Sequence, residues 1–241
     1  MFEKIYDVKY HEITLEGILK PSALMEFLED IAAKNADSLN FGYDEITSKN
    51  YGWFLLKYAM EFYNYPQNVM QIKIATEPRG ANKLFAYRDF YIYDEKNILL
   101  GKVASTWGLI DFATKSMLSP LEVFDGRMYK FEKKETDVNY NKIPSITDVT
   151  CEKNFEVRYD DIDVNHHVNN ATYIVWAFEA LPVEFKTGKK LIRLDINYKK
   201  EIQYGHSVLS LAEVTTDDKT IHCIKNASTD DDLCTLMAFW K

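Results

Sequence analysis

The hydrophobic pattern of the first half of the chain predicts one helix followed by four strands. Residues 21–38 carry apolar side chains at helical spacing, and Pro21 stands at an early helical position. A loosely alternating strand, residues 5–14, precedes this helix. Strand-like runs follow it over residues 51–63, 70–76, 84–93 and 99–110, with turn clusters at 78–82 and 94–97.

The second half of the chain repeats this order. Aligning Val8 with Val157 brings the two predicted helices into register, with Phe27 over Trp176. The pattern predicts a strand at 155–159, a helix at 168–181, and strands at 191–198, 207–214, 220–226 and 233–240. We therefore predict an α+β protein of two tandem β-α-β-β-β-β units, each with a long helix wrapped by an antiparallel sheet. The units span residues 1–128 and 154–241, and a charged linker, residues 129–153, joins them.

The candidate chemistry lies just before the second helix. Asp163, Asn165 and His167 alternate along the chain, and an extended segment would turn all three side chains to one face. Asn169 and Asn170 are good N-cap residues, and a helix N-terminus favours developing negative charge. This combination suits hydrolysis of an acyl group. In the aligned register, the first unit has Thr14, Glu16 and Ile18 instead, so we expect the second unit to be catalytic and the first to be a scaffold or substrate-binding unit.

Composition excludes several other classes of protein. A formal charge of -8 over 241 residues argues against nucleic acid as a partner, and no window approaches the roughly 18 apolar residues of a membrane span. The first residues, 1–6, do not resemble a signal peptide. The three cysteines, Cys151, Cys223 and Cys234, form no CxxC or Cys/His metal spacing. We expect a cytoplasmic protein without a metal or an organic cofactor, and a homodimer is compatible with the sequence.

Three stretches together resemble the acyl-acyl carrier protein (ACP) thioesterases, a family of plant plastid enzymes and shorter bacterial relatives. Residues 163–176 match the family pattern Asp-x-Asn-x-His-Val-Asn-Asn and its following Tyr-Ile-x-Trp. Residues 197–201 resemble the Tyr-Arg-Arg-Glu segment, and residues 106–115 resemble a Trp-x-x-x-Asp-x-x-Thr-Arg segment. Without a transit-like leader, the chain is most similar to the bacterial type.

This resemblance implies a double hotdog fold and hydrolysis of fatty acyl-ACP. It also implies catalytic roles for Asp163, Asn165, His167 and Glu201. Where the family often has a cysteine directly after the glutamate, this chain has Ile202, so we expect water to be the nucleophile. His167 or Glu201 can take its proton, and Asn165 can donate to the thioester carbonyl. Asp163 either orients His167 or polarises the water, and the sequence leaves both roles open.

The carrier is the second open point, because ACP is acidic and so is this chain. Lysines and an arginine near the catalytic unit offer a basic docking patch, although a solvated run of charges is equally compatible with them: Lys186, Lys189, Lys190, Arg193, Lys199 and Lys200. Three rivals remain. They are an acyl-CoA thioesterase of the same fold, a hotdog dehydratase, and an acyl-binding protein without activity. The Asp/Asn/His series speaks against the last two.

Overall fold

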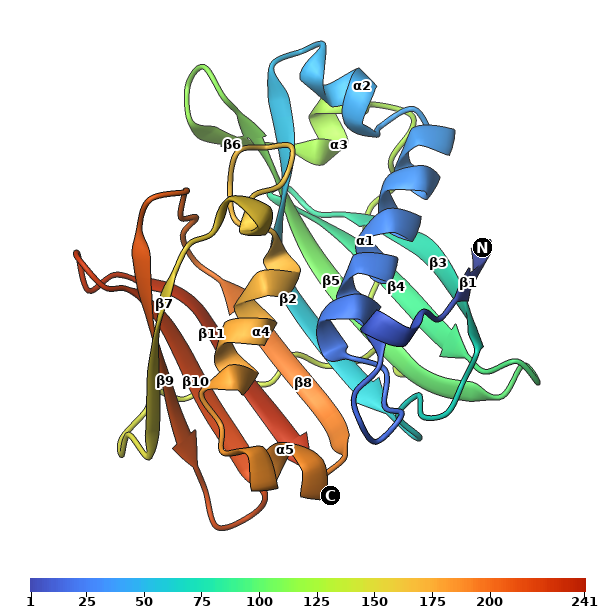
Figure 1. The fold of residues 1–241 in the computed structure, drawn as a ribbon. Helices are drawn as coiled ribbons and strands as arrows, with labels where there is room; N and C mark the ends of the chain where they lie inside the picture. The colour runs from blue at the N-terminus through green and yellow to red at the C-terminus, as the bar shows by residue number, and fades with distance from the viewer.

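The computed structural model describes residues 1–183 and 185–241. Its strands form one 11-stranded antiparallel sheet in the order β1-β3-β4-β5-β2-β8-β11-β10-β9-β7, with β6 paired to β5 (Figure 1). The strands are β1 (Phe2–Asp7), β2 (Tyr51–Phe62), β3 (Gln71–Ala81), β4 (Phe85–Tyr93), β5 (Leu99–Asp111), β6 (Ser116–Leu118), β7 (Cys151–Glu156), β8 (Leu191–Tyr198), β9 (Ser207–Val214), β10 (Lys219–Asn226) and β11 (Asp232–Trp240).

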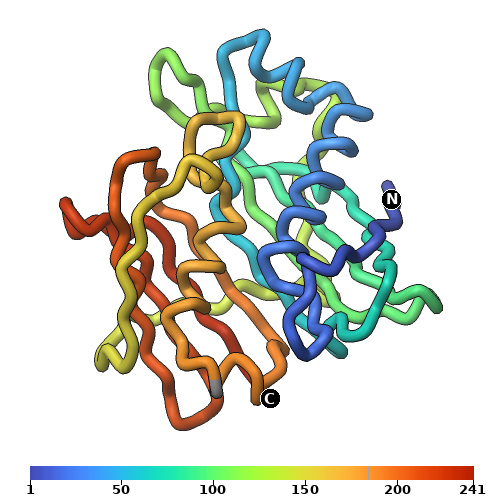
Figure 2. The backbone as a smooth tube through the Cα atoms, viewed as in Figure 1, coloured from blue at the N-terminus to red at the C-terminus, as the bar shows by residue number. Residues whose placement is uncertain are grey.

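Two helices lie side by side on one face of this sheet (Figures 1 and 2). α1 (Pro21–Ser38) and α4 (Asn170–Glu179) each pack against the strands of their own half, and they contact one another. Leu28 and Ile31 of α1 and Ala177 of α4 are fully buried in one shared core. Each half is thus a helix wrapped by antiparallel strands, which is the double hotdog fold that the resemblance implied.

The ladder between β2 and β8 joins the two halves into one sheet. Lys57 pairs with Asn197 at one end of this ladder, and Glu61 pairs with Arg193 at the other. Because the two strands are antiparallel, the halves are related by an approximate twofold axis that passes through the ladder. The loops that precede α1 and α4 therefore lie at opposite ends of the interface between the halves.

Matched backbone contacts confirm the aligned register of the two units. Isolated bridges join Ile13 to Leu19 in the first unit and Ile162 to Val168 in the second. The two bridging segments also dock alike. The N–H of Leu19 donates to the carbonyl of Pro66 at 3.0 Å, as the N–H of Val168 donates to Ile202 at 3.1 Å. The repeat is therefore structural, although few residues are shared.

The strands predicted at 5–14 and 155–159 are wrong in their bounds. β1 ends at Asp7, β7 ends at Glu156, and each is followed by a short 3-10 helix, Tyr10–Glu12 or Tyr159–Asp161. At the end of each of these strands, a carboxylate accepts a backbone N–H and so stabilises the 3-10 turn. Glu12 accepts the N–H of Lys9 at 2.6 Å, and Asp161 accepts the N–H of Arg158 at 2.8 Å. β7 also begins at Cys151, inside the segment predicted as linker.

The turn predicted at residues 78–82 instead lies largely within β3. The strand continues to Ala81 through a register shift after Pro78, where Gly80 has a φ of +82°. At Gly80 a side chain would collide with the carbonyl of Tyr129, so glycine lets the linker approach the strand. Four short elements were not predicted because they are too short to show a period: α2 (Tyr43–Thr47), α3 (Pro120–Val123), α5 (Val183–Gly188) and β6.

The segment between the units crosses the face of the sheet away from the helices (Figure 1). Polar bonds fix it along its course. Asp137 accepts from Arg79 at 2.7 Å, Asn141 donates to Asp195 at 3.1 Å, and the N–H of Thr147 donates to Glu213 at 2.7 Å. Among the described residues, no helix is both long and apolar enough to cross a membrane.

Candidate functional site

A tight turn, not an extended strand, brings the polar triplet together. The N–H of Asp163 donates to the carbonyl of His167 at 2.8 Å, and the N–H of His166 donates back to Asp163 at 3.1 Å. His166 adopts a left-handed φ of +63°, which reverses the chain. The segment is therefore not extended, but Asp163, Asn165 and His167 still line one cavity.

Within this turn, the carboxylate of Asp163 binds Asn165 and not His167. One carboxylate oxygen of Asp163 accepts the backbone N–H of Asn165 at 2.8 Å, and the other accepts its side-chain amide at 3.4 Å. Such a local bond is an Asx turn, which fixes the loop without further partners. The carboxylate is thus placed to orient the amide of Asn165, which is exposed at the mouth of the cavity.

The imidazole of His167 is oriented by a residue of another element. Its Nε2 lies 3.1 Å from Oε2 of Glu201, which follows the end of β8. Its Nδ1 is buried and has no hydrogen-bond partner among the described residues. One ring nitrogen is therefore held by the carboxylate, while the other is enclosed by the protein without a partner among the described residues.

Burial shifts the pKa of both members of this pair. Partial burial lowers the pKa of the His167 imidazole below its ordinary value, and the nearby Asp163 carboxylate only partly opposes this. Burial, with a smaller contribution from Asp163, raises the pKa of the Glu201 carboxyl to about 7. A neutral imidazole beside a carboxyl that titrates near neutrality is a proton-accepting arrangement.

The start of α4 carries a second polar cluster that sequence analysis missed. Asn169 caps the helix as predicted, because its side chain accepts the N–H of Ala171 at 2.8 Å. Glu29 of α1 reaches across from the first unit and accepts from the Asn170 amide at 3.1 Å and from the Asn169 amide at 3.4 Å. Burial raises the pKa of Glu29 to about 7. The sequence signal that could have revealed this cluster was an acidic residue on the apolar face of the first helix.

Replacing Glu29 by glutamine should stabilise the protein at alkaline pH. A carboxyl whose pKa rises from about 4.5 to about 7 on folding lowers stability as pH increases between these values. Because glutamine does not ionise, Glu29→Gln should gain up to about 3 kcal/mol of unfolding free energy relative to wild type between about pH 4 and pH 8. Urea unfolding at both pH values measures this change, and a pH-independent difference would contradict it.

These residues surround the mouth of a large cavity between the two units. Its volume is about 760 Å³, which is within the range of ligand-binding cavities. Small residues of α1 leave room for it, and aromatic and aliphatic side chains of β2 and β5 add apolar walls: Ala32, Ala33, Ala36, Phe54, Leu55, Leu56, Trp107 and Ile110. Trp107 packs against the core and also lines the cavity, whereas Trp176 is buried in the core.

The basic residues do not form the single docking patch that was one of the two interpretations of the sequence. Lys199 and Lys200 line the large cavity, whereas Lys186, Lys189 and Lys190 line a different cavity. The two groups flank opposite ends of β8, a strand of 8 residues that spans roughly 26 Å. Among the described residues, no group of three or more His, Cys, Asp or Glu side chains is arranged to hold a metal ion.

Comparison with known families matches both halves of the chain. The model of the acyl-ACP thioesterase N-terminal domain matches residues 1–123, and that of the acyl-ACP thioesterase C-terminal domain matches residues 145–241. The oleoyl-ACP thioesterase of Coriandrum sativum is 22% identical over 236 residues, 91% of this chain and 64% of its own length. The palmitoyl-ACP thioesterase of Gossypium hirsutum is 24% identical over 93% of this chain and 57% of its own length.

Solved structures share the whole fold. A Lactobacillus plantarum structure that carries the name oleoyl thioesterase is 26% identical, with a TM-score of 0.89, and the match covers 100% of this chain and 95% of that one. The 12:0-ACP thioesterase of Umbellularia californica is 18% identical, with a TM-score of 0.87 over 100% of this chain and 96% of that one. The chain thus spans only 64% and 57% of the two plant relatives' curated sequences, but 95% and 96% of the two solved structures.

Proposed function

Because the chain belongs to the acyl-ACP thioesterase family, we propose that it hydrolyses the thioester of fatty acyl-ACP and releases a free fatty acid. The observation that carries this proposal is the meeting of Asn165, His167 and Glu201 at the mouth of a largely apolar cavity. The acyl chain would lie in the cavity, and the thioester would stay at the mouth. The first unit would then bind substrate while the second supplies the chemistry.

Each polar residue takes one role in this proposal. Glu201 and His167 together accept a proton from the attacking water, with Glu201 holding the imidazole in place. The side-chain amide of Asn165 donates to the carbonyl oxygen as it gains negative charge. Asp163 is a positioning residue, since its carboxylate binds the backbone and the amide of Asn165.

A hydrolysis panel tests the proposed substrate class. Purified protein is given acyl-ACP and acyl-CoA substrates of matched, varied chain length, and release of the free carrier thiol is followed. Faster hydrolysis of acyl-ACP at low substrate concentration is expected. Faster hydrolysis of acyl-CoA would favour the rival thioesterase, and binding without hydrolysis of either would favour an acyl-binding protein.

Activity should rise with pH through neutrality. The Glu201–His167 pair can accept a proton only while Glu201 is a carboxylate, so kcat/KM should increase about tenfold per unit below about pH 7 and level off above it. Glu201→Gln should lower the plateau and remove the inflection near pH 7. A rate that falls as the pH rises through 7 would show that the protonated carboxyl is the active form.

Docking of the carrier should depend on the two lysines at the mouth of the large cavity. Lys199 and Lys200 pair with Asp232 and Asp231 at 2.8 and 2.6 Å, so each can exchange an intramolecular carboxylate for one on an acidic carrier. The double reversal Lys199→Glu, Lys200→Glu should raise KM for acyl-ACP at least about tenfold, and added salt should weaken wild-type binding.

A neutral acyl-pantetheine thioester is the matched control for this reversal, because it enters the same site without a charged carrier. Its KM should change little, and acyl-CoA should fall between the two substrates. Equal effects on all three would place the lysines in the chemistry and not in docking.

We also infer a reducing, cytoplasmic setting. Cys151, Cys223 and Cys234 are all free thiols, and none lies at the proposed site. Burial raises the pKa of Cys223 to about 12, which makes it a poor nucleophile at neutral pH. These observations favour water over a thiol as the attacking group.

A further inference from the structure

A second cavity lies where the twofold relation between the units places the counterpart of the proposed catalytic site. Thr14 and Ile18, the counterparts of Asp163 and His167, line it. Tyr65 lines it as well. Tyr65 is the counterpart of Glu201, because the next residues, Pro66 and Ile202, accept the matched hydrogen bonds from Leu19 and Val168. The fold has thus kept the cavity of the first unit but replaced its proton-accepting groups.

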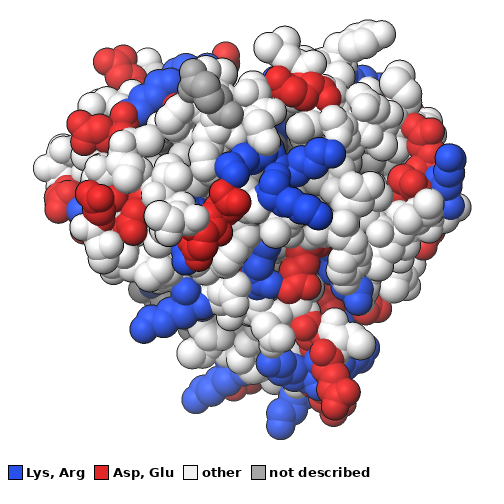
Figure 3. Space-filling view, turned by 90° about the horizontal axis from the view of Figure 1, so that it is seen from below, with Lys and Arg blue, Asp and Glu red and all other residues white. Residues whose placement is uncertain are grey.

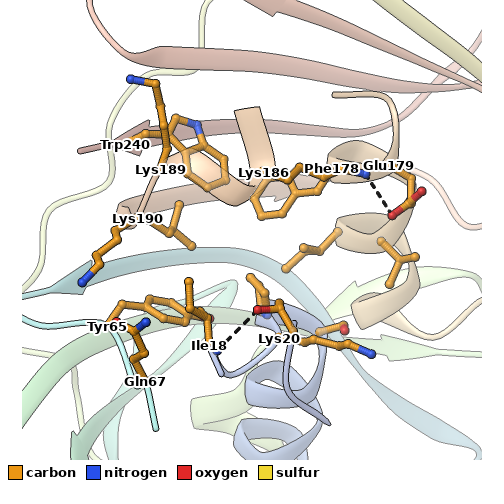
Figure 4. A pocket seen from close by; sticks show the side chains of 16 residues that line it. Ile18, Lys20, Tyr65, Gln67, Phe178, Glu179, Lys186, Lys189, Lys190 and Trp240 are labelled. Atoms are coloured by element: carbon orange, nitrogen blue, oxygen red, sulfur yellow. Dashed lines mark hydrogen bonds and ion pairs between the residues drawn. The ribbon is translucent and has the colours of Figure 1, made fainter. Parts of the chain in front are cut away.

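The chemistry of this cavity is cationic at its edges and apolar inside. It has a volume of about 350 Å³ and is lined by four lysines and one glutamate. In Figure 4, Lys20 and Lys190 lie on opposite sides of the cavity, with Phe178 and Trp240 along one wall and Ile18 and Tyr65 along the other. Figure 3 shows Lys and Arg side chains gathered at the centre of this face of the molecule.

Only part of this positive charge is neutralised within the protein. Lys186 pairs with Glu179 at 3.2 Å and Lys189 pairs with Asp218 at 2.6 Å. The ammonium group of Lys20 donates to the carbonyl of His11 at 2.8 Å, which does not neutralise its charge. Among the side chains that the structure describes, Lys20 and Lys190 have no carboxylate within ion-pair distance.

Two further donors point to an anionic ligand. α1 begins at this cavity with Pro21 and Ser22 in its lining, and the N-cap residue Lys20 provides no side-chain cap, in contrast to Asn169 at α4. An uncapped N-terminus of an 18-residue helix leaves backbone N–H groups for an anion. Tyr65 also lines the cavity, is 7% exposed, and has a buried hydroxyl without a partner among the described residues.

We propose that this second cavity binds an alkyl carboxylate, with the carboxylate beside Lys20 and the start of α1, Lys190 adding positive charge from the opposite side, and the alkyl chain against Ile174, Leu191 and Trp240. A free fatty acid has this chemistry, whether it is released by this protein or supplied from elsewhere. The proposal goes beyond hydrolysis, since the cavity has no counterpart of the His167–Glu201 pair. It requires binding only and does not depend on the catalytic assignment.

Methyl NMR of the full chain tests the site separately from the large cavity. The probe is decanoate. Methyl groups of Ile18, Ile174 and Leu191 report on the second cavity, and those of Ile110 and Val168 report on the large one. The methyl resonances of Ile18, Ile174 and Leu191 should shift as decanoate is added, until the site is saturated. Their apparent affinity for decanol or for inorganic phosphate alone should be at least about tenfold weaker.

Charge reversal and filling of the cavity supply the decisive variants. Lys20→Glu, Lys190→Glu should weaken the response of the first set at least about tenfold and leave that of Ile110 and Val168 unchanged. Val175→Phe fills the cavity from a position that is 39% exposed, and should have the same effect. Lys83→Glu, at an exposed lysine outside both cavities, is the matched control and should bind like wild type.

Several outcomes would overturn this proposal. They are shifts confined to the Ile110 and Val168 methyls, an equal response to decanol, an equal response to phosphate alone, and an equal loss in the Lys83→Glu control. Each is independent of whether acyl-ACP is hydrolysed. An inactive protein that binds decanoate here would refute the proposed function alone, and an active one that does not would refute this site alone.

Discussion

His167→Ala should lower the turnover of acyl-ACP by about 10²–10⁴-fold, which is the usual contribution of a positioned proton acceptor. The imidazole lies at the large cavity with its Nε2 3.1 Å from Oε2 of Glu201, so it forms half of the proposed proton-accepting pair. Its removal also leaves Glu201 without the partner that fixes its geometry. KM should change far less than kcat, because the acyl chain binds elsewhere in the cavity.

The neighbouring histidine is the matched control for this substitution. His166 lies in the same turn but is exposed, and its contribution is the left-handed backbone of the turn. His166→Gly keeps that conformation available and should retain activity within a few-fold. Wild-type turnover in His167→Ala, or an equal loss in both variants, would remove His167 from the chemistry.

Asn165→Ala should lower kcat by about 10²–10³-fold, as the loss of one oxyanion donor does. The amide is held at the mouth by Asp163, so its position is fixed before substrate binds. Asn165→Asp is the sharper test, because it keeps the shape of the side chain but removes the donor and adds a charge beside Asp163. It should be at least as inactive as the alanine variant.

The stability of both Asn165 variants should match that of wild type, since the side chain is exposed. Asp163→Asn should show a smaller loss, because the variant can still accept the N–H of Asn165 through its amide oxygen. If Asp163→Asn were more damaging than Asn165→Asp, the carboxylate would act directly on water, which is one of the two roles that the sequence left open.

The order of the elements and their repeat could be predicted because both produce periodic patterns of hydrophobic residues in the sequence. The register that places Val8 over Val157 survives in matched hydrogen bonds, although the two loops share little sequence. The turn at the site was missed because its left-handed residue is a histidine, which carries no signal of its own. Its counterpart in the first unit is Gly17, with a φ of +71°, and this glycine was the signal available.

What failed was the inference of proximity from sequence spacing. Lys190 and Lys199 are close in the chain, but an extended strand between them places them at different cavities. Glu29 lies far from Asn170 in the chain, yet α1 and α4 pack together and bring the two side chains into contact. The site is therefore shared between the units, and only its second half is visible as a motif.

The most direct measurement of the central claim is release of free ACP thiol from acyl-ACP by the purified wild-type chain, with His167→Ala and Asn165→Ala in parallel. We predict steady hydrolysis by the wild type, a loss of at least about tenfold in each variant, and unchanged unfolding transitions in both. Hydrolysis that persists at the wild-type rate in both variants, or a wild-type protein that releases no thiol from acyl-ACP of any chain length, would contradict the account.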